Sequence, residues 1–191
     1  MKVIVNGTNS LKEAFEVIVK GADGVGISLD KESGITREEA NDLVFYLPPI
    51  SSSVLMTNSV TPIKIVDDAK YINVNTLELD GNILINDIAI IREKLPYLKF
   101  IKKINVYDKD AIKISENYKK HVDAILLEVD AMDNECLSIC KKIIDDCDYV
   151  LLMANVSKDY LAVIKELNPY GIVVNYDECK NLKEFINAIE K

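Results

Sequence analysis

The chain has 191 residues, 49% of them hydrophobic, and a formal net charge of −8 that comes from 31 acidic against 23 basic side chains. This length suits one hydrophobic core, and the acidic balance excludes nucleic acid as a partner, because binding to phosphates needs clustered cations. No apolar run is long enough to cross a membrane, and Asn6-Gly7 interrupts the first one too early for a secretion signal. We therefore expect a cytoplasmic protein with a single domain over residues 1–191.

Short apolar segments of β-type composition recur along the whole chain, and a segment with helical spacing follows each of them. The apolar segments begin near Lys2, Ala22, Ser52, Val74, Lys99, Val122, Tyr149 and Gly171. The helical segments cover residues 11–20, 37–47, 62–71, 83–95, 109–120, 133–147, 158–167 and 181–190. A helix between successive strands makes the strands parallel, and eight such units can close on themselves. The sequence therefore predicts an α/β fold, a compact (β/α)8 TIM barrel, with an open doubly wound sheet as the rival.

Several of the predicted helices begin with recognisable capping residues. Ser10-Leu11-Lys12-Glu13 and Thr36-Arg37-Glu38-Glu39 have the spacing of capping boxes, in which a hydroxyl and a carboxylate satisfy free backbone N–H groups. Thr61-Pro62 places proline at a first helical position, and Ser157 can cap the seventh helix. These caps place the preceding loops at the C-terminal ends of the strands.

The cysteines and the only histidine do not form a recognisable reactive site. Cys136, Cys140 and Cys147 share one face of the sixth helix, and Cys179 lies far along the chain. We interpret them as free thiols in the core, since a metal site would need a CxxC pair or a nearby histidine. His121 precedes the sixth strand, at the end of a barrel that contributes to stability, which excludes Ser-His and Cys-His triads. We expect no metal and no cofactor.

Polar residues end nearly every predicted strand, where the active site of such a barrel lies. They are Asn6, Ser28, Asp30, Asn58, Asp80, Asn105, Glu128, Asp130, Asn155 and Asn175. Ordinary turn formation explains most of them. Glu128 differs because it interrupts an apolar strand, where a carboxylate is costly unless it is partnered or solvated. We expect Asn155 and Asn175 to contact a substrate.

Lys102-Lys103 lies inside the fifth strand, whose successive side chains point to opposite faces. One lysine should therefore face the barrel and the other the helices. We assign Lys102 as the cation that an anionic substrate would need.

The first unit, Asn6-Gly7-Thr8-Asn9-Ser10-Leu11, resembles the Cys-Gly-Ile-Thr-Ser-Leu segment of phosphoribosylanthranilate isomerases, which are (β/α)8 enzymes of tryptophan biosynthesis. Residues 20–26, 36–40, 77–81, 124–128 and 169–174 are similar to further segments of that family. The resemblance implies an Amadori rearrangement, in which a general acid opens a phosphoribosylamine ring and a general base moves a proton from C2′. The family's acid is matched by Glu128.

The resemblance places Asn6 where the family has its basic cysteine, and an amide cannot abstract a proton. Asp80 or Asp30 is then the candidate replacement base. The family's phosphate-binding segments fall at Ala154-Asn155 and at Asn175-Tyr176-Asp177, without the glycines that let N–H groups approach a phosphate. The arginine of the family's second loop falls near Ser33, and its Gly-Gly-Thr-Gly stretch is absent.

Three functions remain open from the sequence. The first is a divergent isomerase, the second a barrel of that lineage that now serves in binding or regulation, and the third an isomerase-like or lyase-like enzyme for another small metabolite. We expect isomerase turnover to be absent or very weak. The expected partner is a small-molecule substrate such as a sugar phosphate, and a homodimer stays open.

Overall fold

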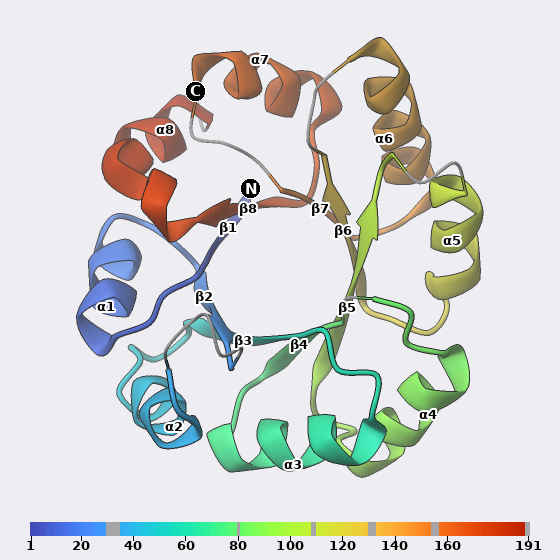
Figure 1. The fold of residues 1–191 in the computed structure, drawn as a ribbon. Coiled ribbons are helices and arrows are strands. Elements are labelled where there is room, and N and C mark those ends of the chain that lie inside the picture. The colour runs from blue at the N-terminus through green and yellow to red at the C-terminus, as the bar shows by residue number, and fades with distance from the viewer. Residues whose placement is uncertain (30–34, 80, 108–109, 130–132, 154–156, 190–191) are drawn as a thin grey trace.

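The computed structural model describes the chain except for residues 30–34, 80, 108–109, 130–132, 154–156 and 190–191. Eight parallel strands form one closed barrel, in chain order, and the helices form a ring around it (Figure 1). The strands are β1 (Lys2–Asn6), β2 (Gly24–Ser28), β3 (Ser52–Thr57), β4 (Thr76–Leu79), β5 (Lys99–Asn105), β6 (Ala124–Glu128), β7 (Val150–Met153) and β8 (Gly171–Asn175). The predicted (β/α)8 TIM barrel is confirmed.

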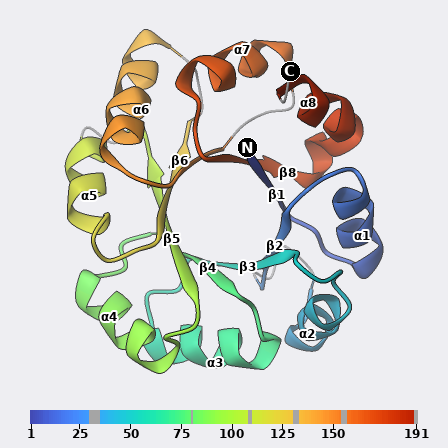
Figure 2. The ribbon, with the colours of Figure 1, turned by 180° about the vertical axis from the view of Figure 1, so that it is seen from behind.

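The barrel closes between its first and last strands. β1 and β8 are parallel, and their register pairs Val3 with Ile172 and Val5 with Val174. An open doubly wound sheet would leave these two strands unpaired, so the rival architecture is excluded. The same ring is visible from the opposite end of the molecule (Figure 2).

The helices follow the predicted segments with small differences at their ends. They are α1 (Leu11–Val19), α2 (Arg37–Phe45), α3 (Pro62–Ile72), α4 (Ile85–Lys94), α5 (Ala111–Tyr118), α6 (Asn134–Asp146), α7 (Lys158–Leu167) and α8 (Leu182–Ile189). A 3₁₀ turn, η1 (Tyr176–Asn181), precedes α8. No helix among the described residues is both long and apolar enough to cross a bilayer.

The predicted caps are present at most of these helices. Thr36 and Glu39 form a complete capping box at α2, and Ser157 Oγ accepts a hydrogen bond from Tyr160 N at α7. At α1 the box is altered: Ser10 Oγ accepts from the backbone of Glu13, but the Glu13 carboxylate accepts from Asn9 N, 2.7 Å away. The carboxylate thus serves the residue before the cap.

Side chains inside the barrel lie in layers, each built from alternate strands. The strand registers define three layers that we name by their height. The mouth layer, nearest the C-terminal ends of the strands, contains Asn6, Met56, Lys103 and Met153. The middle layer contains Gly26, Glu78, Leu126 and Val173. The floor layer contains Ile4, Val54, Ile101 and Leu151. Of these, Ile4, Ile101 and Leu151 pack with Leu126 and Val173 in one inner hydrophobic cluster.

Candidate functional site

The C-terminal mouth of the barrel gathers several of the predicted site residues. Asn6, Glu128 and Asn175 are the last residues of β1, β6 and β8. Parallel strands bring these three ends to the same side of the molecule. His121 precedes β6 whereas Glu128 ends it, so the histidine is at the opposite end.

Several predicted residues lie outside the described part of the chain. Asp80, proposed as the replacement base, and Asn155, proposed as a substrate contact, are among them. The same holds for Asp30, Asp130 and Ser33. Their roles stay predictions.

Asn6 is buried in the mouth layer and its amide is unsatisfied. The residue is 1% exposed, and neither Nδ2 nor Oδ1 has a hydrogen-bond partner within the described structure. The amide occupies space that Gly26 leaves open: a Cβ at position 26 would lie 2.0 Å from Asn6 Oδ1. A buried amide without partners is costly, by about 1–3 kcal/mol for each unsatisfied group. Such a group fits a ligand that supplies both a donor and an acceptor.

Glu128 is partnered by a lysine of the neighbouring strand. Lys103 Nζ lies 3.2 Å from Glu128 Oε1, and the two side chains are 16% and 29% exposed. Lys103 faces inward because it has the same parity as Ile101, which belongs to the inner cluster. This ion pair explains how the strand tolerates a carboxylate at the mouth.

The assignment of Lys102 to the substrate site is corrected by the structure. Lys102 is buried on the helix-facing side of β5, where its Nζ donates to Gly81 O over 2.7 Å and lies 5.5 Å from the centre of the Tyr118 ring. Lys103 is the lysine that faces into the barrel. Sequence alternation requires the two residues to diverge, but only the pairing of Lys103 with Leu126 on β6 decides which one turns inward.

Glu78 is a buried carboxylate that we did not predict as a site residue. It is 2% exposed, in the middle layer, and its neighbouring strands contribute Met56 and Lys103 to the layer above. The sequence shows only the alternation Thr76-Leu77-Glu78-Leu79, and the strand register decides that the acidic residue faces inward. Among the described residues, the upper part of the barrel interior therefore contains Glu78 and Glu128 together with Lys103.

Other polar residues at the mouth serve local structure. Asn105 Oδ1 accepts a hydrogen bond from Tyr107 N, and Thr57 Oγ1 accepts one from Ser59 N, as ordinary turn residues do. Asn175 is exposed; its backbone oxygen accepts from Cys179 Sγ, and its side chain makes no capping bond to η1. Asn175 is thus available at the rim of the mouth.

The cysteines are free thiols, as predicted, although one of them is only partly buried. Cys136, Cys140 and Cys179 are buried, whereas Cys147 is half-buried. Burial raises the pKa of Cys140 and the pKa of Cys179 to about 11, and it also raises those of Cys136 and Cys147. In the described residues, no three His, Cys, Asp or Glu side chains come together as a metal site would require.

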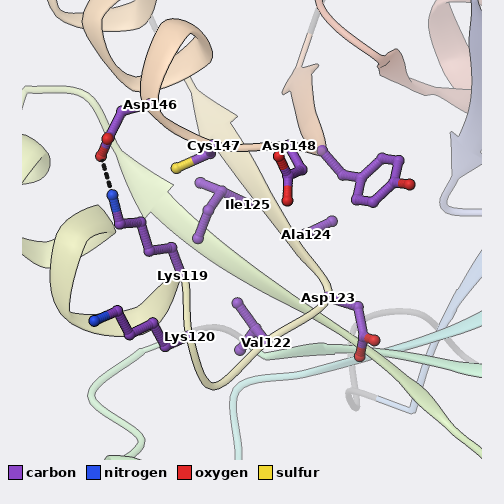
Figure 3. Close-up of a pocket in the computed structure, with 10 residues that line it drawn as sticks. Lys119, Lys120, Val122, Asp123, Ala124, Ile125, Asp146, Cys147 and Asp148 are labelled. Carbon is purple, nitrogen blue, oxygen red and sulfur yellow. Dashed lines mark hydrogen bonds and ion pairs between the residues drawn. The ribbon is translucent and has the colours of Figure 1, made fainter.

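A cavity of about 330 Å³ opens at the other end of the molecule, where α5 and α6 end and β6 and β7 begin (Figure 3). Lys119 points toward Asp146 and forms an ion pair with it, while Asp123 points away from this pair. Cys147 also lines the cavity, but its raised pKa leaves little thiolate.

Comparison with known proteins confirms the resemblance drawn from the sequence. No protein-family model matches the chain. The N-(5′-phosphoribosyl)anthranilate isomerase of Methanocella arvoryzae is 29% identical over 130 residues, which cover 66% of this chain and 61% of that enzyme. The chain thus spans about 61% of the length of such curated relatives.

Solved structures agree over the whole barrel. Phosphoribosyl anthranilate isomerase from Thermotoga maritima superposes with a TM-score of 0.84 at 23% identity, covering 100% of this chain and 98% of that one. A phosphoribosyl anthranilate isomerase in complex with reduced 1-(o-carboxyphenylamino)-1-deoxyribulose 5-phosphate gives a TM-score of 0.83 at 23% identity, with the same coverage. The Thermotoga maritima enzyme is described as dimeric. At this identity the likeness shows the fold alone.

Proposed function

We propose that this protein is a phosphoribosylanthranilate isomerase-like barrel that binds a phosphoribosylamine or its ketose product at the mouth and turns it over very weakly or not at all. The observation that supports this most directly is Asn6, a buried and unsatisfied amide at the end of β1. The resemblance places the family's base at this position. An amide at this position can still form hydrogen bonds to a ligand, but it cannot abstract a proton.

The proposed chemistry begins at Glu128. Its carboxyl group would protonate the ring oxygen of the phosphoribosylamine, the C1′–O bond would break, and the nitrogen lone pair would form an iminium. Lys103, 3.2 Å away, holds this carboxyl in place. The next step removes the C2′ proton to give an enolamine, which becomes the ketose amine. Asn6 cannot accept that proton, so we expect the reaction to stall there.

Binding is supported by the same amide. Asn6 offers Nδ2–H groups as donors and Oδ1 as an acceptor, and a hydroxyl or a vicinal diol can satisfy both. A ribulose chain carries such hydroxyls. Met56 and Met153 share the layer and offer apolar, polarisable contacts beside them. The mouth therefore suits a molecule that combines hydroxyls with an apolar or aromatic part.

The decisive experiment follows the fluorescence of phosphoribosylanthranilate during incubation with pure protein. We expect the wild type to be slower than an ordinary isomerase by at least the contribution of the lost base, roughly 10²–10⁴-fold. Asn6→Cys should raise turnover, because it restores a group that can be a base and is no larger than asparagine. Asn6→Ser is the matched control and should not.

Two results would contradict parts of this proposal. Wild-type turnover at an ordinary rate that Glu128→Gln abolishes would show that another base operates. Turnover that survives Glu128→Gln would show that the acid is a different residue.

A purely binding or regulatory role is the second candidate, and the unsatisfied Asn6 amide favours it as well. Calorimetry with reduced 1-(o-carboxyphenylamino)-1-deoxyribulose 5-phosphate separates the two. Binding that Asn6→Ala weakens, without turnover of the substrate in the wild type, would support a pseudoenzyme that retains the ligand site. Absence of binding would overturn both candidates and favour another metabolite.

We include a homodimer and a cytoplasmic location in the proposal. The homodimer is supported by the dimeric Thermotoga maritima enzyme and by the exposed Phe45 and Tyr46 rings at the end of α2. Light scattering coupled to size exclusion tests it, and a monomeric mass over the working concentration range would reject it.

A further inference from the structure

The lower end of the barrel, opposite the mouth, contains a cavity of about 430 Å³. The floor layer of Ile4, Val54, Ile101 and Leu151 closes the inner end of this cavity. One step lower, the inward positions carry only small residues. They are Gly24, Thr76, Ala124 and Gly171. This level lies below the three filled layers, and its small side chains leave the cavity open.

Backbone packing keeps two of these small residues small. A Cβ at Gly24 would lie 2.7 Å from Ser52 O, and a Cβ at Gly171 would lie 2.8 Å from Lys2 O. Position 124 faces the cavity itself, and a larger side chain there would have room. An unfilled aliphatic cavity loses packing energy. Ala124 thus leaves space in which an occupant could make these contacts.

Two lysines stand on opposite sides of this cavity. Lys2 on β1 and Lys99 on β5 occupy inward positions just below the small residues, and these strands face each other across the barrel (Figure 1). Lys2 Nζ lies 2.6 Å from Asp23 Oδ1, and Lys99 Nζ lies 3.3 Å from Asp123 Oδ1. Each ammonium has three N–H donors, and these contacts use one of them.

The two aspartates are occupied on their other oxygen. Asp23 Oδ2 accepts from Val3 N over 2.8 Å, and Asp123 Oδ2 accepts from Phe100 N over 2.9 Å. Arg92 also pairs with Asp123 Oδ2, 3.0 Å away. The carboxylates are therefore engaged by the protein, whereas the ammonium groups keep donors for an incoming acceptor. The two lysines and two aspartates that line the cavity balance in formal charge, so an anion would be recognised through the remaining ammonium N–H donors.

The opening also exposes apolar groups. The Tyr149 and Tyr170 rings contact each other edge to face with their centres 4.9 Å apart, and both are about half exposed. Ile50 is fully exposed with φ of 76°, a conformation that a β-branched residue rarely adopts. Strain of this kind is concentrated at sites where ligands bind.

We propose that this lower cavity binds a small monocarboxylate with an aromatic or alkyl body. The body packs against Ile4, Val54, Ile101 and Leu151, and the carboxylate accepts hydrogen bonds from Lys2 and Lys99 at the opening. The volume is within the range of small-molecule pockets. The site is at the opposite end of the barrel from Asn6 and Glu128, so the inference does not depend on the proposed function.

The test is an NMR titration of the full chain with 3-phenylpropionate, and with 3-phenylpropionamide as the uncharged probe of matched shape. We expect saturable shifts at the methyl groups of Ile4 and Leu151, while those of Met56 and Met153 at the mouth stay in place. Lys2→Gln combined with Lys99→Gln should weaken the carboxylate by about fivefold or more and leave the amide nearly unchanged.

Ala124→Leu is the second variant, because it fills the cavity without removing a charge. It should abolish binding of both probes while the protein keeps its circular dichroism spectrum and unfolds at the same temperature as wild type or a higher one. The proposal is overturned if wild type shows no saturable shift at millimolar probe, or if Ala124→Leu binds as well as wild type. Equal affinity for acid and amide would overturn the assignment of a carboxylate ligand.

Discussion

The side-chain amide of Asn6 rests against the bare α-carbon of Gly26, on the adjacent strand, so closely that a Cβ there would lie 2.0 Å from Oδ1. The two residues are direct register partners of β1 and β2. Gly26 is thus required by a side chain and not by its own backbone angles. The side chain at position 6 therefore fits only because position 26 has none.

Gly26→Ala should therefore destabilise the protein through Asn6. Overpacking inside a barrel costs about 1–3 kcal/mol in the free energy of unfolding, and Met56 Sδ, 3.1 Å from the added Cβ, restricts escape on the other side. Urea unfolding measures the loss. In an Asn6→Gly background, Gly26→Ala should reduce the free energy of unfolding by much less. An equal loss in that background would show that the Asn6 side chain is not what excludes a Cβ at position 26.

Breaking the pair of Lys103 and Glu128 should also reduce stability. Lys103→Met leaves the partly buried Glu128 carboxylate without its ion-pair partner. We expect a loss of about 1–3 kcal/mol in the free energy of unfolding. A double-mutant cycle with Glu128→Gln isolates the pair, and full additivity of the two substitutions would show that the pair contributes nothing.

Acid should weaken the contribution of Asp123. Burial acts to raise its pKa, but the hydrogen bond from Phe100 N and the Arg92 guanidinium together lower the pKa below its ordinary value. A carboxyl with a lowered pKa in the folded state stabilises the protein above its unfolded pKa and loses that effect as the pH falls through the folded value. The advantage of wild type over Asp123→Asn should therefore shrink below about pH 4. A difference that stays constant from neutral pH to pH 2 would refute this, and urea unfolding at each pH measures it.

Alkylation should distinguish the four thiols. Cys147 is partly exposed, whereas Cys140 and Cys179 are buried with pKa values raised to about 11. Iodoacetamide attacks the thiolate, so both access and ionisation favour Cys147. Mass spectrometry should find Cys147 modified first and Cys140 and Cys179 last. In urea the order should disappear, and early modification of Cys140 in native buffer would mean that α6 opens readily.

Much of the fold could be predicted from the sequence because its signals are local. The alternation of β-type and helical segments, together with caps such as Thr36 and Ser157, depends on neighbours within a few residues. The 3₁₀ turn ahead of α8 was not predicted, since Asn181 reads equally well as a helix start. The hydrogen bond from Asn9 N to the Glu13 carboxylate was not predicted either, because Asn9 N and Ser10 N are adjacent donors and the sequence does not distinguish them.

The site was harder to predict because its geometry depends on strand register. Glu128 and Asn6 were found from their places at strand ends. Lys102 was preferred to Lys103 although only the register with β6 decides which one faces inward. Glu78 was missed because one acidic residue in a short strand is equally compatible with an exposed position. Which residues face inward depends on the pairing of strands that are distant in the sequence, and this pairing cannot be read from a single sequence.

The seam between β1 and β8 has a consequence for how the chain reaches its native state. Strand β1 gains its second neighbour only when residues about 170 positions later arrive, so its edge stays open until β8 docks. Contacts so distant in sequence carry a large loop-closure cost and slow the search for the folded state. During synthesis, the earlier strands must wait as an incomplete sheet with two unpaired edges, the state most prone to association with other chains. The docking of β8 onto β1 thus completes the barrel, and the chain is most prone to aggregate before this step.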